Sequence, residues 1–173
     1  MTTPAISPAS TDQAPSVGIG SDALVGCLHT LHARSPIAVT NKMNFLNMYV
    51  DADFVAVTMA GQVIEYEIKV SRADFHRDRK KLRHKIYDGQ QPGERPNRFW
   101  YVTANCIITA DDLPAWAGWM EYENGALNVR KDAPKLSPDK HSPVVLLRLA
   151  RAMRSRAPNK TGLPVGGPAQ PRK

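Results

Sequence analysis

IEYEIKVS, residues 64–71, ends an apolar segment of the chain and begins a basic one. Successive side chains of an extended strand alternate between two faces, so Glu65, Glu67 and Lys69 are expected on one side and the apolar residues on the other. Charged groups at alternate positions do not suit an apolar core, but they suit a site that holds a divalent cation beside an amine. The alternative is that Glu67 and Lys69 belong to an exposed cross-strand charge ladder.

A β-hairpin is predicted around Ala60-Gly61-Gln62, because residues 54–59 and 63–70 are β-prone on either side of the glycine. Asp53 stands eight residues before that glycine and Glu67 stands six residues after it. A small bulge or offset in the pairing would therefore bring the two carboxylates together.

Two carboxylates, water and a phosphate oxygen are ligands that suit Mg²⁺ or Mn²⁺. Asp53 and Glu67 are the candidate metal ligands, and the backbone carbonyl of Ile68 is a candidate third. Lys69 would lie beside the metal, where it could position or deprotonate the attacking water and stabilise charge on the phosphate. The predicted catalytic residues are therefore Asp53, Glu67 and Lys69.

A basic helix is predicted over residues 72–87, with Ser71 opening a capping box. Phe75, Leu82 and Ile86 recur at helical spacing and form its core-facing stripe, which leaves the basic residues on the solvent side. Such a one-sided charge distribution is typical of a surface that neutralises phosphates. The predicted DNA contacts are Arg72, Arg79, Lys80, Lys81, Arg83 and Lys85, with Arg98 extending the surface before the next strand.

The whole chain has 173 residues and a formal net charge of +7, which favours a polyanionic partner. Cys27 and Cys106 stand far apart, so neither a zinc site nor a disulfide framework is expected. No apolar run is long enough to cross a membrane, and the N-terminus does not follow the pattern of a signal peptide. We therefore expect a cytoplasmic protein that has DNA, and no membrane, as its partner.

One folded domain is predicted over residues 21–156, preceded by a disordered leader (1–20) and followed by a disordered basic tail (157–173). Both ends are rich in Pro, Gly and small polar residues and lack periodic apolar patterns. Between them the predicted order is helix, strands, helix, strand, short strands and helix. The first helix is expected to open with Ser21 or Asp22 as its cap, and the short strands are expected to pair as a hairpin around Asn124-Gly125. That order indicates an α/β fold.

Asp53 followed by Glu67-Ile68-Lys69 resembles the PD-(D/E)XK nuclease motif. The longer run over residues 65–75, with Asp78, Lys80 and Lys81 after it, is similar to the MmcB-like DNA repair nucleases and related phage proteins; the resemblance covers residues 51–136. It implies a restriction-endonuclease-like fold, a mixed central sheet flanked by helices. It also implies metal-dependent hydrolysis of DNA phosphodiester bonds in repair, recombination or phage replication.

Two departures from this family pattern bear on activity. Many members of the wider fold use a glutamate on the first helix, whereas residues 21–34 offer only Asp22. Asp51 also competes with Asp53 as the aspartate ligand. Two alternatives stay open: a catalytically inactive nuclease-fold protein that binds DNA as an accessory factor, and a protein-binding module. The sequence also leaves open whether the chain forms a homodimer.

Overall fold

Six strands form one mixed sheet in the part of the chain that the computed structural model describes, residues 19–43, 51–137 and 147–150. The strands follow one another across the sheet in chain order. They are β1 (Ile37–Met43), β2 (Ala52–Val57), β3 (Val63–Lys69), β4 (Arg98–Thr103), β5 (Gly118–Glu123) and β6 (Ala126–Lys131).

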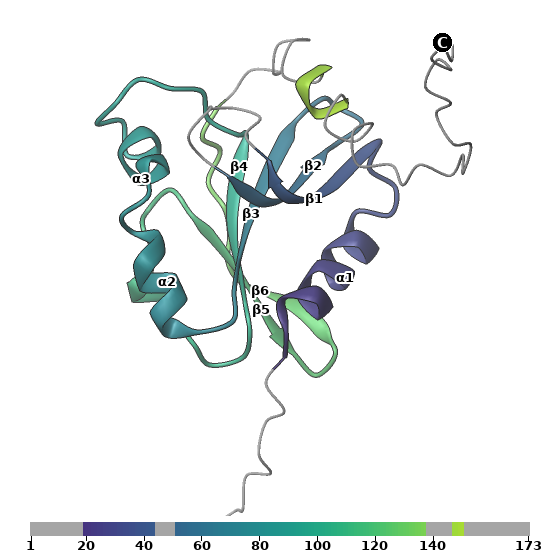
Figure 1. Cartoon of the computed structure of the whole chain (residues 1–173), viewed down its shortest axis with the longest axis vertical. Coiled ribbons are helices and arrows are strands. Elements are labelled where there is room, and N and C mark those ends of the chain that lie inside the picture. Colours follow the sequence, from purple (N-terminus) through teal and green to yellow (C-terminus); the bar gives the residue numbers. More distant parts are fainter. Residues whose placement is uncertain (1–18, 44–50, 138–146, 151–173) are drawn as a thin grey trace, which may run out of the picture.

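The direction of pairing changes across the sheet. β1, β2 and β3 pair antiparallel, β3, β4 and β5 pair parallel, and β5 and β6 form an antiparallel hairpin. Parallel neighbours need a crossover connection, and helices supply it between β3 and β4 (Figure 1). The predicted α/β class with a mixed central sheet flanked by helices is confirmed.

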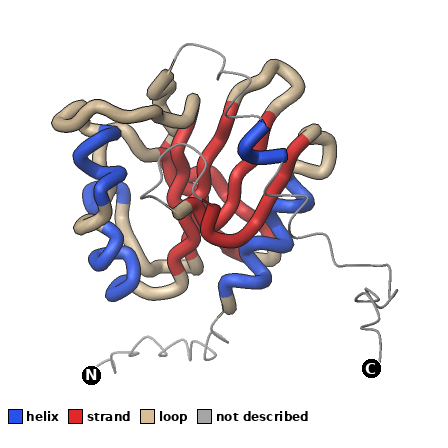
Figure 2. Tube along the Cα trace, turned by 45° about the horizontal axis from the view of Figure 1, so that its top comes forward, coloured by secondary structure: helices blue, strands red, loops and turns tan. Residues whose placement is uncertain are grey.

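Helices cover both faces of this sheet. α1 (Ser21–Leu31) packs on one face, and the short helices α2 (Arg72–Asp78) and α3 (Leu82–Tyr87) lie on the other (Figures 1 and 2). A 3-10 turn, η1 (Ala110–Asp112), precedes β5 on the α2 side, where Asp112 pairs with Arg72. No helix in these described segments has the length and hydrophobicity that a membrane crossing requires.

The β2–β3 hairpin forms where the sequence predicts it. Gly61 has a φ of +75°, a backbone conformation that glycine adopts at little cost, and the Thr58 amide donates to the Gln62 carbonyl. Val57 pairs with Val63 and Phe54 with Tyr66. The hairpin is therefore symmetric about residue 60, and no bulge is needed to bring its far ends together.

The α1 face of the sheet is an apolar core. Leu24 and Leu28 of α1 are fully buried against β2 and β3. The strand residues of this cluster are Phe54, Ala56, Tyr66, Ile68, Trp100, Val102 and Met120. This packing fixes which face each residue of β3 presents.

Two sequence expectations for the fold are wrong, and one strand was missed. The predicted helix over residues 72–87 is two helices, because the chain leaves the helical conformation at Lys81, where ψ is 146°. The first helix is capped by Gly20 without a side-chain cap, so neither Ser21 nor Asp22 serves as its cap. β1 was not predicted. The predicted leader and tail lie outside the described residues, apart from the last two residues of the leader.

Candidate active site

The charged residues of β3 share the face that α2 and α3 cover. Glu65, Glu67 and Lys69 are 1%, 1% and 3% exposed, and their partners come from those two helices and the segment between them. The predicted common face is confirmed. The alternative of an exposed charge ladder is wrong, because these three side chains are buried. Charged groups at buried positions must be paired.

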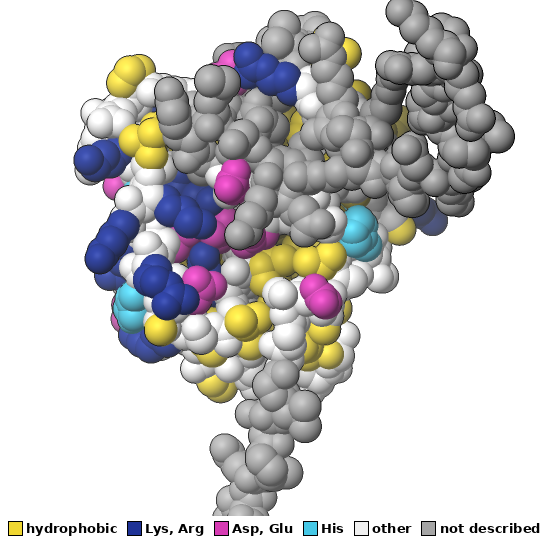
Figure 3. Space-filling view, in the orientation of Figure 1, with side chains coloured by type: hydrophobic (Ala, Val, Ile, Leu, Met, Phe, Trp, Pro, Cys, Tyr) yellow, Lys and Arg dark blue, Asp and Glu magenta, His cyan; other side chains and the backbone are white. Residues whose placement is uncertain are grey.

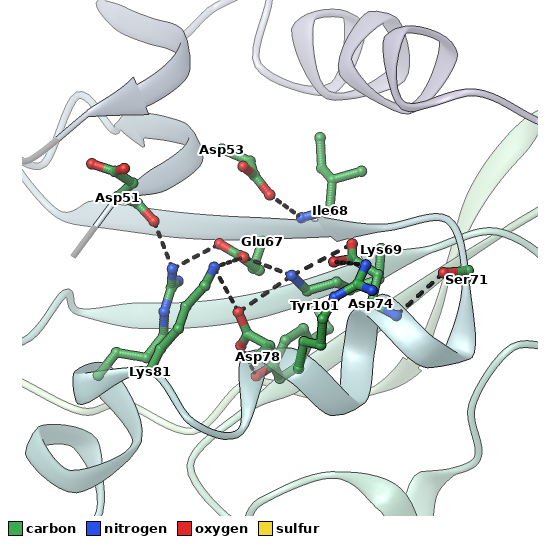
Figure 4. A network of polar contacts seen from close by, with 12 residues as sticks. Asp51, Asp53, Glu67, Ile68, Lys69, Ser71, Asp74, Asp78, Lys81 and Tyr101 are labelled. Carbon is green, nitrogen blue, oxygen red and sulfur yellow. Dashed lines mark hydrogen bonds and ion pairs between the residues drawn. The ribbon is translucent and has the colours of Figure 1, made fainter.

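Asp53 is the second residue of β2 and directly precedes Phe54, which pairs with Tyr66 of β3. Continuing that register places Asp53 opposite Glu67. Its carboxylate Oδ2 accepts a hydrogen bond of 2.9 Å from the Ile68 amide, so the aspartate is fixed against β3 (Figure 4). Asp51, the competing candidate, contacts this region through its carbonyl, which accepts from Arg83 Nη2 at 2.6 Å.

Glu67 is the centre of the charged network. Its Oε1 accepts from Lys69 Nζ at 2.8 Å and also contacts the ammonium of Lys81 (Figure 4). Its Oε2 lies 2.8 Å from Arg83 Nη2. One buried carboxylate therefore meets three cations, which come from β3, the α2–α3 break and α3.

Asp78 is a site residue that the sequence reasoning missed. Its Oδ1 lies 2.7 Å from Lys81 Nζ and 3.3 Å from Lys69 Nζ, so it shares both lysines with Glu67. Its Oδ2 accepts from the Tyr101 hydroxyl at 2.6 Å and lies 3.3 Å from His84 Nε2. A signal was available, because Asp78 stands three residues after Phe75 and so falls on the core-facing stripe of the helix.

Arg83 is fully buried, so its predicted position on the solvent side is wrong. It donates to Glu65 Oε1 at 2.7 Å and lies over the Phe99 ring, 5.4 Å from the ring centroid. The Tyr87 hydroxyl donates to the other oxygen of Glu65 at 2.6 Å. The helix break before Leu82 starts a new helical phase, which turns Arg83 into the core.

The pKa of Glu67 is raised and the pKa of Asp78 is lowered from their ordinary values. Burial raises the pKa of Glu67 to about 7; the Arg83 charge opposes this shift, and Asp78 and Asp53 add to it. Burial also raises the pKa of Asp78, but a hydrogen bond with His84, the charge of Arg83 and a hydrogen bond with Glu67 together carry it well below its ordinary value. Adjacent carboxyls that share a proton behave in this way.

Lys69 keeps its proton at neutral pH. Burial lowers the pKa of its amine, but the neighbouring Glu67 and Asp78 carboxylates outweigh burial and the net pKa is raised. A charged ammonium can stabilise negative charge or orient water. The expectation that Lys69 deprotonates a water is therefore not favoured by its surroundings.

A polar cleft of about 360 Å³ opens beside these residues at the end of β3. It brings the three predicted catalytic residues together with the first residue of α1. Its lining residues are Ser21, Asp53, Glu67, Ile68, Lys69, Val70, Asp74 and Lys81. Asp22, the acid of the first helix, is exposed in the first turn of α1.

The remaining predicted DNA contacts separate into two groups. Lys80, Lys81 and Lys85 are exposed on the α2–α3 side, where Lys and Arg side chains gather in the space-filling view (Figure 3). Arg72 and Arg79 are exposed on the same side, but they also hold η1: Arg72 makes two hydrogen bonds to the Asp112 carboxylate, and Arg79 donates to the Asp112 carbonyl at 2.8 Å.

Arg98 does not extend this surface. It shares strand parity with Trp100 and Val102, which pack on the α1 face, and its guanidinium donates to the Ala133 carbonyl. Its predicted place beside the basic helices is therefore wrong.

The donor set can hold a divalent cation through two carboxylates. Asp53 and Glu67 line the same cleft, and Glu67 Oε2 takes no hydrogen bond from the described residues although Arg83 lies beside it. In the described part of the chain, no group of three or more His, Cys, Asp or Glu side chains is arranged to hold a metal ion. A cation here would complete its shell with water and phosphate oxygens, as Mg²⁺ commonly does.

No protein-family model and no curated protein matches this sequence. A solved structure with a similar fold is SPO1766, a protein of unknown function from Silicibacter pomeroyi. The two are 20% identical, with a TM-score of 0.56 over 76% of this chain and 84% of that one. Identity this low shows a shared fold alone, so the function must be argued from the site itself.

Proposed function

We propose that this chain is a metal-dependent nuclease of the restriction-endonuclease-like fold that hydrolyses phosphodiester bonds in DNA. The observation that carries the proposal is the meeting of Asp53, Glu67 and Lys69 in one polar cleft at the end of β3. The family motif combines these three residue types, and the hairpin register brings Asp53 opposite Glu67. The exposed cations beside the cleft, on the α2–α3 side, suit a phosphate backbone.

Asp53 and Glu67 would hold the cation, Mg²⁺ or Mn²⁺, with the Ile68 carbonyl as the third predicted donor. The bound cation would polarise the phosphate and lower the pKa of a bound water. Lys69, which stays charged, would stabilise negative charge as it grows on the phosphate oxygens. Lys80 and Lys85 would contact phosphates along the strand and position the backbone over the cleft.

The test is cleavage of plasmid and single-stranded DNA by the purified chain in Mg²⁺, in Mn²⁺ and in EDTA. We expect cutting with either metal and none in EDTA. Asp53→Asn, Glu67→Ala and Lys69→Met should each lower the rate by about 100-fold or more, and Asp51→Asn, the matched control, should cut normally. Metal-dependent cutting that survives both Glu67→Ala and Lys69→Met would overturn the site assignment.

A second candidate function is DNA binding without cleavage. The specific observation in its favour is that both oxygens of Glu67 already contact cations, from Lys69, Lys81 and Arg83. This reading predicts salt-sensitive retention of DNA that weakens in Lys80→Ala and Lys81→Ala, with no cutting in any metal. Failure to retain DNA near physiological salt would instead favour a protein-binding module.

A further inference from the structure

Two adjacent lysines of the α2–α3 break have different surroundings. Lys80 is exposed, whereas Lys81 directs its ammonium into the cleft, in contact with Glu67 Oε1 and 2.7 Å from Asp78 Oδ1 (Figure 4). Lys69 Nζ approaches the same two oxygens from β3. The space between Glu67 and Asp78 is therefore already occupied by positive charge.

In each carboxylate of this pair, one oxygen accepts hydrogen bonds from the described part of the chain and the other does not. Glu67 and Asp78 are each 1% exposed, and the oxygens Glu67 Oε2 and Asp78 Oδ1 accept no hydrogen bond from the described residues, although cations lie beside both. Around them, the carboxylates of Glu65, Glu67 and Asp78 lie beside three cations, those of Lys69, Lys81 and Arg83. Two further carboxylates, Asp53 and Asp74, line the cleft next to them, so carboxylates outnumber these cations.

Of these three cations, only the Lys81 ammonium is placed so that it can move out of the cleft. Lys69 and Arg83 have side chains that are 4% and 0% exposed, whereas the side chain of Lys81 is 41% exposed and lies at the mouth of the cleft. A lysine carries its charge on a flexible stem, so its ammonium can move while its backbone stays in place. The backbone of Lys81 is fixed as the N-cap of α3.

We infer that Glu67 and Asp78 form a divalent-cation subsite that the Lys81 ammonium fills in the metal-free chain. A divalent cation takes the place of the ammonium between the two carboxylates, and the released Lys81 turns outward to meet a DNA phosphate. This inference rests on the proposed function for its biological meaning, and it adds Asp78 to the ligands that the motif supplies. The exchange makes metal binding and phosphate binding depend on each other.

The test is the affinity for Mn²⁺ alone, without DNA, measured by titration calorimetry on the full chain. Lys81→Met removes the competing charge and should bind Mn²⁺ at least fivefold more tightly than the wild type. Lys80→Met, the matched control, should stay within twofold. Asp78→Asn should bind at least tenfold more weakly, and circular dichroism of each variant shows that it is folded.

Each result decides the inference separately from the proposed function. If the wild type binds Mn²⁺ and cuts DNA but Lys81→Met binds with unchanged or weaker affinity, the inference is wrong and the nuclease proposal stands. If Lys81→Met binds more tightly while folded Asp78→Asn is unchanged, Asp78 is not a ligand and the inference is also wrong. If the wild type neither binds metal nor cuts DNA, the nuclease proposal fails; Mn²⁺ binding gained in Lys81→Met would still support the inference, and no gain would overturn it.

Discussion

β3 presents Tyr66 and Ile68 to α1 and presents Glu65, Glu67 and Lys69 to the α2–α3 side. On the first side, packing of apolar groups stabilises the fold without specific partners. On the second side, every buried charge needs a partner at the right distance, and the gain from pairing is offset by the loss of hydration. The same seven-residue strand thus carries a stabilising face and a costly one, and the costly face is the one that opens into the cleft.

The largest expected loss of stability comes from unpairing the charged face. Arg83→Met should lower the free energy of unfolding by about 3–5 kcal/mol, because Glu65 and Glu67 lose their common buried cation. Urea denaturation measures the change. Lys85→Met, on the exposed side of the same helix, is the matched control and should change stability little. A loss below about 1 kcal/mol for Arg83→Met would mean that solvent reaches the charged face and screens its ion pairs.

A loss of stability of similar or smaller size is expected on the apolar face, and this loss should not depend on pH. Leu28→Ala should destabilise the chain by about 2–5 kcal/mol through the cavity it leaves. Leu31→Ala, on the exposed side of the same helix, should cost far less. Because no charge is involved, the Leu28→Ala loss should be the same at pH 5 and pH 8. A pH-dependent loss would show that the two faces are coupled.

The smallest expected change in the free energy of unfolding is a gain and not a loss. Burial raises the pKa of Glu67 to about 7 from an ordinary 4.5, so the folded chain holds a proton that the unfolded chain has released. Stability from this group is therefore present below pH 4.5 and falls as the pH rises to about 7. Glu67→Gln mimics the protonated carboxyl and should be more stable than the wild type by roughly 1–3 kcal/mol at pH 8, with little difference at pH 5.

Thermal unfolding at the two pH values measures this gain. Glu123→Gln, which alters an exposed ion pair with Arg130, is the control and should show no such pH dependence. If Glu67→Gln is instead less stable at pH 8, the ion pairs of Glu67 outweigh its burial, and the charged face would be stabilising.

The sequence predicted the elements whose formation depends on neighbouring residues. The β2–β3 hairpin follows from Gly61 and the alternating pattern around it, and the β5–β6 hairpin from Asn124-Gly125, which both have positive φ. The meeting of Asp53 with Glu67 follows from that first hairpin. Each of these features can be read within a short window of sequence.

The features that the sequence did not predict depend on distant contacts. Arg83 is buried because Glu65 and Glu67, on another element, provide its partners. The helical spacing from Phe75 turns Asp78 toward the core, but its place in the site depends on Lys69 of β3 and Tyr101 of β4, which contact its carboxylate. A count of basic residues along one helix cannot distinguish an arginine that faces solvent from one that pairs inside the core.

We propose that the charged face of β3 is retained for catalysis at the expense of stability. Plasmid cleavage in Mg²⁺ at pH 8 by the wild type and by Glu67→Gln, both folded at the temperature used, tests it most directly. We expect that the wild type cuts and that the more stable Glu67→Gln variant does not. Cutting by Glu67→Gln at the wild-type rate, or no cutting by either protein, would contradict it.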